Sequence, residues 1–140
     1  MADEEYNAGA GGEISMWPSS IGMAATFDPA LVESFGDIAS REYRALGITT
    51  ALSPQIDLAT EPRWGRFGGT FGPDPRLATD MARAYVDGFQ TSSGDAEIEG
   101  GWGYESVNAM IKHWPGGGTG RCVACSGPPA HAKSKASRDR

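Results

Sequence analysis

The sequence predicts an α/β fold in which helices and short buried strands alternate along the chain. Two segments, residues 29–46 and 74–90, have apolar residues at helical spacing, and an Asp-Pro pair stands at the start of each. Two short apolar runs, residues 48–52 and 107–111, have the length and composition of buried strands. Helix, strand, helix and strand in this order are typical of a parallel sheet with right-handed crossover connections.

The first helix is expected over residues 29–46. Asp28 can cap it, and Pro29 suits the first helical position because its missing N–H would be unpaired there anyway. Gly47 follows, and a glycine readily takes the left-handed conformation that ends a helix. The apolar stripe recurs every three or four residues, at Leu31, Phe35, Ala39, Tyr43 and Leu46.

The second helix, expected over residues 74–90, begins in the same way. Asp74 can cap it and Pro75 can occupy the first turn. The two helices therefore frame the first strand and the loop that follows it. The apolar face of the second helix consists of Leu77, Met81, Ala84, Tyr85 and Phe89.

Polar segments follow both predicted strands. Residues 53–73 form a long loop, and loops of this length inside compact domains are usually functional. Lys112 and His113 come directly after the second strand. Because parallel strands end at the same edge of a sheet, Arg66 in the long loop and the Lys112-His113 pair are expected to face one shared site.

The chemistry of Lys112, His113 and Trp114 suits a ligand with many hydroxyl groups. Lys offers donors, His can donate or accept, and the indole of Trp gives a flat apolar surface for the C–H face of a sugar ring. The same residues would also fit a plain loop with an exposed Lys and a packed Trp. The expected convergence with Arg66 favours the ligand site.

Composition narrows the classes of partner. With 39% hydrophobic and 21% charged residues, the chain has the composition of a globular protein of one domain or part of one. Residues 1–118 carry all but one of the acidic residues, which argues against nucleic acid as a partner. No run of about 18 apolar residues predicts a membrane span. Residues 1–13 show no signal-peptide pattern and are expected to be a flexible lead-in.

Three motifs together resemble glycoside hydrolase family 3, which includes β-glucosidases and related exo-acting enzymes. The first runs from Leu52 through Asp57 to the Arg63-Trp64-Gly65-Arg66 group, the second is Thr70-Phe71-Gly72-Pro73-Asp74-Pro75, and the third runs from Lys112 to Gly118. The resemblance covers residues 14–118. It implies a partial (β/α)8 (TIM-type) barrel, incomplete at both ends, with no cofactor. Members of the family are often periplasmic or secreted, and the location of this chain stays unknown.

The resemblance also implies site residues. Arg66, Lys112 and His113 match the family residues that hold a sugar, and a β-glucoside-like carbohydrate is the implied partner. Asp57, Arg63, Trp64 and Trp114 are expected to line the site or to support it, since Asp57 beside Arg residues also fits a structural ion pair.

No catalytic residue is assigned in this chain. Family members have an Asp nucleophile in a Ser/Thr-Asp-aromatic motif and a later acid/base carboxylate, and neither follows Gly118 here. Retaining hydrolysis needs two carboxylates roughly 5 Å apart, and Glu61 and Glu105 are the local acids that could replace them. The expected function is β-glucosidase-like hydrolysis by ancestry. The alternative is a non-catalytic sugar-binding or interaction module from a truncated gene.

Residues 119–140 are expected to be a disordered tail that is not homologous to the family. Cys122 and Cys125 could form a zinc set with His113 and His131, or a redox pair, or be incidental thiols; we assign no metal site. The glycines at residues 116–118 lack the spacing of a phosphate-binding loop.

Overall fold

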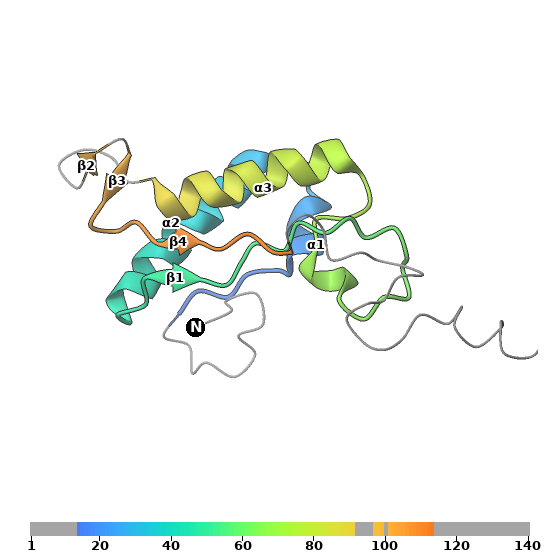
Figure 1. The fold of residues 1–140 in the computed structure, drawn as a ribbon, viewed down its shortest axis with the longest axis horizontal. Helices are drawn as coiled ribbons and strands as arrows, with labels where there is room; N and C mark the ends of the chain where they lie inside the picture. Colours follow the sequence, from blue (N-terminus) through green and yellow to red (C-terminus); the bar gives the residue numbers. More distant parts are fainter. Residues whose placement is uncertain (1–13, 92–96, 100, 114–140) are drawn as a thin grey trace, which may run out of the picture.

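The computed structural model describes residues 14–91, 97–99 and 101–113. In chain order they form α1 (Ser20–Ala24), α2 (Pro29–Ala45), β1 (Thr50–Ala51), the 3-10 helix η2 (Phe67–Gly69), α3 (Pro75–Gln90), β2 (Glu97–Glu99), β3 (Trp102–Gly103) and β4 (Asn108–Ala109). Figure 1 shows α2 and α3 packed together on one side of the β1–β4 pair. The α/β class predicted from the sequence is confirmed. The lead-in, Trp114 and the tail lie outside the described residues.

Both long helices begin as predicted. The Asp28 carboxylate accepts hydrogen bonds from the amides of Ala30 and Leu31, at 3.0 and 3.4 Å. Asp74 accepts one from the Leu77 amide at 2.8 Å. These bonds pair amide groups that the first turn of a helix leaves without an internal partner.

The end of α2 differs slightly from the prediction. The helix stops at Ala45 and Leu46 serves as its C-cap, one residue before the predicted end. Gly47 has φ 76°, the left-handed conformation expected of it. Leu46 is therefore 59% exposed, because the chain has already turned away from the core at this point.

The core lies where α2 meets α3. Phe35 of α2 packs against Tyr85 and Phe89 of α3, with ring centroids 5.4 and 5.8 Å apart. Tyr85 and Phe89 stack on each other at 4.7 Å. Contacts of this kind contribute about 0.5–1.5 kcal/mol per pair beyond the burial of apolar area. The apolar stripes of the two helices therefore face each other, as their spacing predicted.

β1 and β4 are parallel neighbours, as predicted. Thr50 pairs with Asn108 and Ala51 with Ala109. The pairing continues beyond the strands, because the Lys112 amide donates to Pro54 O at 3.0 Å and the Ile56 amide donates to Lys112 O at 2.7 Å. The segments that follow the two strands thus run side by side toward α1 (Figure 1).

Some elements were not predicted. α1, η2 and the antiparallel β2–β3 pair are only two to five residues long, too short for apolar periodicity to reveal them. β2 and β3 lie in the segment between α3 and β4, for which the sequence analysis above gives no helix or strand. The strands β1 and β4 are themselves shorter than the apolar runs that predicted them.

Candidate functional site

The candidate site lies at the carboxyl ends of β1 and β4. Gln55 forms a parallel β-bridge with Lys112, so the first residues of the long loop lie beside the Lys112-His113 pair. The peptide bonds Ser53-Pro54 and Lys112-His113 are both cis. Backbone pairing therefore brings together two parts of the sequence that carry predicted site residues.

Asp57 and His113 are in direct contact. His113 Nδ1 lies 2.8 Å from Asp57 Oδ2, although the two residues are 56 positions apart in the chain. The Asp57 side chain is fully buried, whereas that of His113 is 38% exposed. An ion pair between Asp57 and a neighbouring Arg was one expectation from the sequence. In the structure the Asp57 carboxylate has a histidine partner in the segment that follows β4.

Lys112 is half-buried and Arg66 is exposed. Within residues 14–91, 97–99 and 101–113, no carboxylate forms an ion pair with either cation. Arg41 and Arg63, by contrast, pair with Asp37 and Glu61. The donors of Lys112 and Arg66 are thus not engaged by acidic groups of the described chain.

The loop that carries Arg66 is held near the site by its backbone. Arg66 stands at the start of η2, and its carbonyl accepts a hydrogen bond from the Gly69 amide at 3.2 Å. A Cβ added to Gly69 would lie 3.4 Å from Gln55 Oε1, so the end of η2 touches the residue that pairs with Lys112. The Ala59 amide also donates to Gly72 O at 3.1 Å, which closes the base of the loop. The structure places Asp57 and His113 in contact, but it records no contact of Arg66 with Lys112 or His113.

Arg63 and Glu61 form a pair on the surface of the loop. Arg63 Nη2 lies 2.8 Å from Glu61 Oε2, and the Arg63 side chain is 87% exposed. Hydrogen bonds from the Arg63 side chain and backbone lower the pKa of Glu61 to about 2, while the Glu61 carboxylate raises the pKa of Arg63. Glu61 is therefore deprotonated at neutral pH and is a poor general acid. Trp64 follows this pair, and its amide donates to Glu61 O at 3.0 Å.

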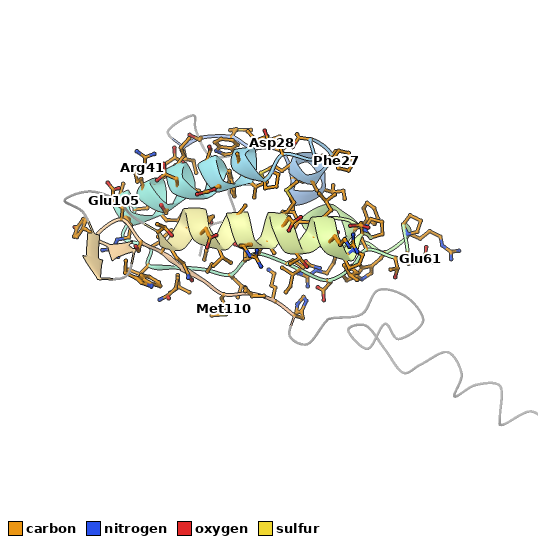
Figure 2. The ribbon with its side chains drawn as sticks, turned by 90° about the horizontal axis from the view of Figure 1, so that it is seen from above. Phe27, Asp28, Arg41, Glu61, Glu105 and Met110 are labelled. Carbon is orange, nitrogen blue, oxygen red and sulfur yellow. The ribbon has the colours of Figure 1, made fainter. Side chains whose placement is uncertain are left out.

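Glu61 and Glu105, the two local acids considered as a catalytic pair, lie far apart in the structure. Figure 2 shows Glu61 and Glu105 at opposite ends of the molecule. Carboxylates that act on one glycosidic bond are separated by roughly 5–10 Å, depending on the stereochemical outcome. The idea that Glu61 and Glu105 together replace the missing catalytic residues is therefore wrong.

Gln55 lies in the candidate site and was not predicted from the sequence. Its side chain is buried, with 6% of the residue exposed, and its Nε2 has no hydrogen-bond partner in the described structure. Buried amides are usually paired, so an unpaired one stands out. The available signal was its position two residues before Asp57, on the first strand's continuation.

A separate cavity of about 530 Å³ lies on the outside of α2 and α3, lined in part by Glu33, Asp37, Asp87 and Glu105. None of the predicted sugar-binding residues lines it. Arg41 also lines the cavity, and its guanidinium is paired with Asp37. The candidate site considered below is the one at the strand ends, where the predicted residues lie. In the described ranges no group of His, Cys, Asp and Glu is placed to hold a metal ion, and no helix there could cross a bilayer.

Comparison with known proteins identifies relatives that are glycoside hydrolases. The sequence profile described as "Glycosyl hydrolase family 3 N terminal domain" matches residues 1–136, which extends past the limit at Gly118 expected from the motifs. A periplasmic β-glucosidase/β-xylosidase of Dickeya chrysanthemi is 50% identical over 110 residues, covering 79% of this chain and 16% of the relative. β-Glucosidase C of Emericella nidulans is 46% identical over 115 residues, covering 80% of this chain and 18% of the relative. The chain thus spans less than a fifth of the length of these relatives.

Solved structures agree in fold. A β-glucosidase involved in saponin metabolism from intestinal bacteria superposes with a TM-score of 0.65 at 33% identity, covering 72% of this chain and 13% of that one. A β-glucosidase from Listeria innocua in complex with glucose superposes with a TM-score of 0.62 at 32% identity, covering 71% of this chain and 13% of that one. The same enzyme has also been solved, as a mutant, with laminaribiose.

Proposed function

Because the chain belongs to glycosyl hydrolase family 3, we propose that it forms the sugar-holding part of a β-glucosidase-like hydrolase. Its described residues would be one portion of a (β/α)8 barrel, a fold that takes about 250 residues when complete. The proposed substrate is a β-glucoside-like carbohydrate, in keeping with relatives that are β-glucosidases.

The observation that supports the proposal is a set of cationic donors after the two strands, Lys112 beyond β4 and Arg66 on the loop that follows β1. Lys112 and Arg66 are not paired with any carboxylate of the described chain, and His113 is held beside Lys112 by Asp57. Cations without acidic partners at the carboxyl edge of a parallel sheet suit a neutral ligand rich in hydroxyl oxygens.

The chemical step needs groups beyond these. In retaining hydrolysis a carboxylate attacks the anomeric carbon and forms a glycosyl–enzyme bond, while a carboxylic acid protonates the departing oxygen. Arg66, Lys112 and His113 would fix the sugar for this attack, a contribution of positioning. Asp57 is engaged with His113 and Glu61 with Arg63, so we assign neither the nucleophile nor the acid/base to this chain. By itself the chain would act as a sugar-binding module without turnover.

The proposal is tested by titrating glucose and laminaribiose into the full chain while recording ligand-observed NMR and calorimetry. Weak binding is expected, and Lys112→Ala and Arg66→Ala should each reduce it by about tenfold to a hundredfold, the effect of one hydrogen bond from a charged donor. Arg83→Ala is the matched control, since Arg83 is an exposed arginine of α3 away from the strand ends. Binding that is unchanged in both site variants would contradict the proposal.

A further inference from the structure

We infer that Asp57 is a positioning residue that fixes the tautomer of His113, so that His113 Nε2 accepts a hydrogen bond from a hydroxyl group of the sugar. This inference rests on the proposed function and adds to it a requirement on the ligand. A group that only accepts hydrogen bonds would not satisfy Nε2, whereas a hydroxyl would.

The tautomer follows from the contact. Asp57 Oδ2 lies 2.8 Å from His113 Nδ1, and a carboxylate can only accept a hydrogen bond. In the neutral imidazole the proton must then be on Nδ1, which leaves a lone pair on Nε2. A hydrogen bond at one ring nitrogen commonly fixes the orientation and tautomer of a histidine that binds a ligand through its other nitrogen.

The two ring nitrogens of His113 lie in different environments, because Asp57 is buried and His113 is partly exposed. The Asp57 side chain has no exposed surface, whereas His113 keeps 38% of its side chain exposed. The Nδ1 edge therefore faces the interior and Nε2 belongs to the other edge of the ring. Among the described residues Nε2 has no hydrogen-bond partner, so its lone pair is available to a ligand.

Backbone pairing holds both residues in register. The Ile56 amide donates to Lys112 O at 2.7 Å, and the Lys112 amide donates to Pro54 O at 3.0 Å. Asp57 directly follows Ile56, and His113 directly follows Lys112. Their relative placement is thus set by the strand pairing, and a ligand would meet a preorganised ring.

Lys112 complements this arrangement. Its ammonium group has three donors and no acceptor, whereas Nε2 of the neutral His113 ring is an acceptor. A sugar hydroxyl has both functions, because it can accept from Lys112 and donate to His113. The pair can therefore distinguish a hydroxyl from a fluorine or an ether oxygen, which lack the proton.

The first test observes the tautomer directly, in the full chain labelled with ¹⁵N and without any sugar. The sequence contains two histidines, so a His131→Gln variant assigns the ring signals in long-range ¹H–¹⁵N spectra. At a pH where the spectra show a neutral ring, His113 should carry its proton on Nδ1. Asp57→Asn should shift the ring toward the other tautomer, since an amide can donate to Nδ1. A proton on Nε2 in the unaltered chain, or the same tautomer population in both chains, would overturn the inference.

The second test uses binding. Glucose should bind Asp57→Asn about fivefold to tenfold more weakly than the unaltered chain, the effect of one lost hydrogen bond. Asp80→Asn, an exposed position of α3, is the control and should bind normally. At least one deoxyfluoro-glucose should bind the unaltered chain less well than glucose and lose this disadvantage in Asp57→Asn.

The outcomes separate the inference from the proposed function. If Lys112→Ala weakens glucose binding and Asp57→Asn does not, the positioning role is wrong and the sugar site stands. If no chain binds sugar, the proposed function fails, and the spectra still decide whether Asp57 sets the tautomer.

Discussion

Gly36 and Gly88 lie backbone to backbone where α2 crosses α3. A Cβ on Gly88 would lie 2.3 Å from Glu33 O, and a Cβ on Gly36 would lie 2.9 Å from the Cα of Gly88. No side chain fits at either position unless a helix moves. The close approach lets Phe35 and Phe89, one residue away from these glycines, reach the same aromatic cluster.

Gly88→Ala should therefore destabilise the fold. Overpacking costs about 1–3 kcal/mol, and this contact is with backbone, which cannot rotate away. The measurement is urea unfolding followed by circular dichroism. Gly65→Ala is the control because nothing lies within 4 Å of a Cβ there; equal midpoints for the two variants would contradict the prediction.

Loss of a helix cap should be measurable in α3. Asp74→Ala removes the bond from the Leu77 amide and should lower the free energy of unfolding by about 0.5–2 kcal/mol. Asp80→Ala, an exposed position within the same helix, should change it by much less. If thermal melts of the two variants coincide, Asp74 does not act as a cap.

Glu61 should titrate at unusually low pH. Its pKa is lowered to about 2 by hydrogen bonds from Arg63, so the stability that the pair contributes is fully present above about pH 4.5. It is lost as pH falls toward 2. The contribution is expected to be small because the pair is exposed. Carbon-detected NMR of the carboxylate should report the low pKa, and Arg63→Gln should return it toward the ordinary value; no change on that substitution would contradict the assigned cause.

The chain of 140 residues should not turn over an aryl β-glucoside. Glu61 and Glu105 lie at opposite ends of the molecule (Figure 2), and Asp57 is engaged with His113. A chromogenic assay on protein from a host without β-glucosidase background measures this. Turnover that survives purification and disappears in Glu61→Gln or Glu105→Gln would show that the local acids do the chemistry.

The long helices could be predicted because their signals are local. Asp28 and Asp74 mark the first turns of α2 and α3, and the apolar spacing extends over several turns. The predicted ends of both helices were therefore correct to within one residue. α1 and the β2–β3 pair could not be predicted, since two to five residues carry no periodicity.

The site was predictable only in part. Strand order placed the segments after β1 and β4 at one edge, and the Gln55–Lys112 bridge confirms that placement. The partner of Asp57 was not predictable, because the nearby arginines were obvious candidates and His113 becomes a neighbour only through the sheet. The buried amide of Gln55 was missed for the same reason: its burial depends on η2, which folds back from later in the chain.

The pairing of Thr50 with Asn108 also determines at which stage of folding the candidate site forms. These strands are joined through the long loop, α3 and the β2–β3 segment, so their bonds form only after a large stretch of chain has been closed into a loop. Such closure is entropically costly, and non-local contacts of this kind form slowly compared with helices. The Asp57–His113 contact depends on that pairing. A newly made chain would therefore acquire its helices early and the Asp57–His113 contact late.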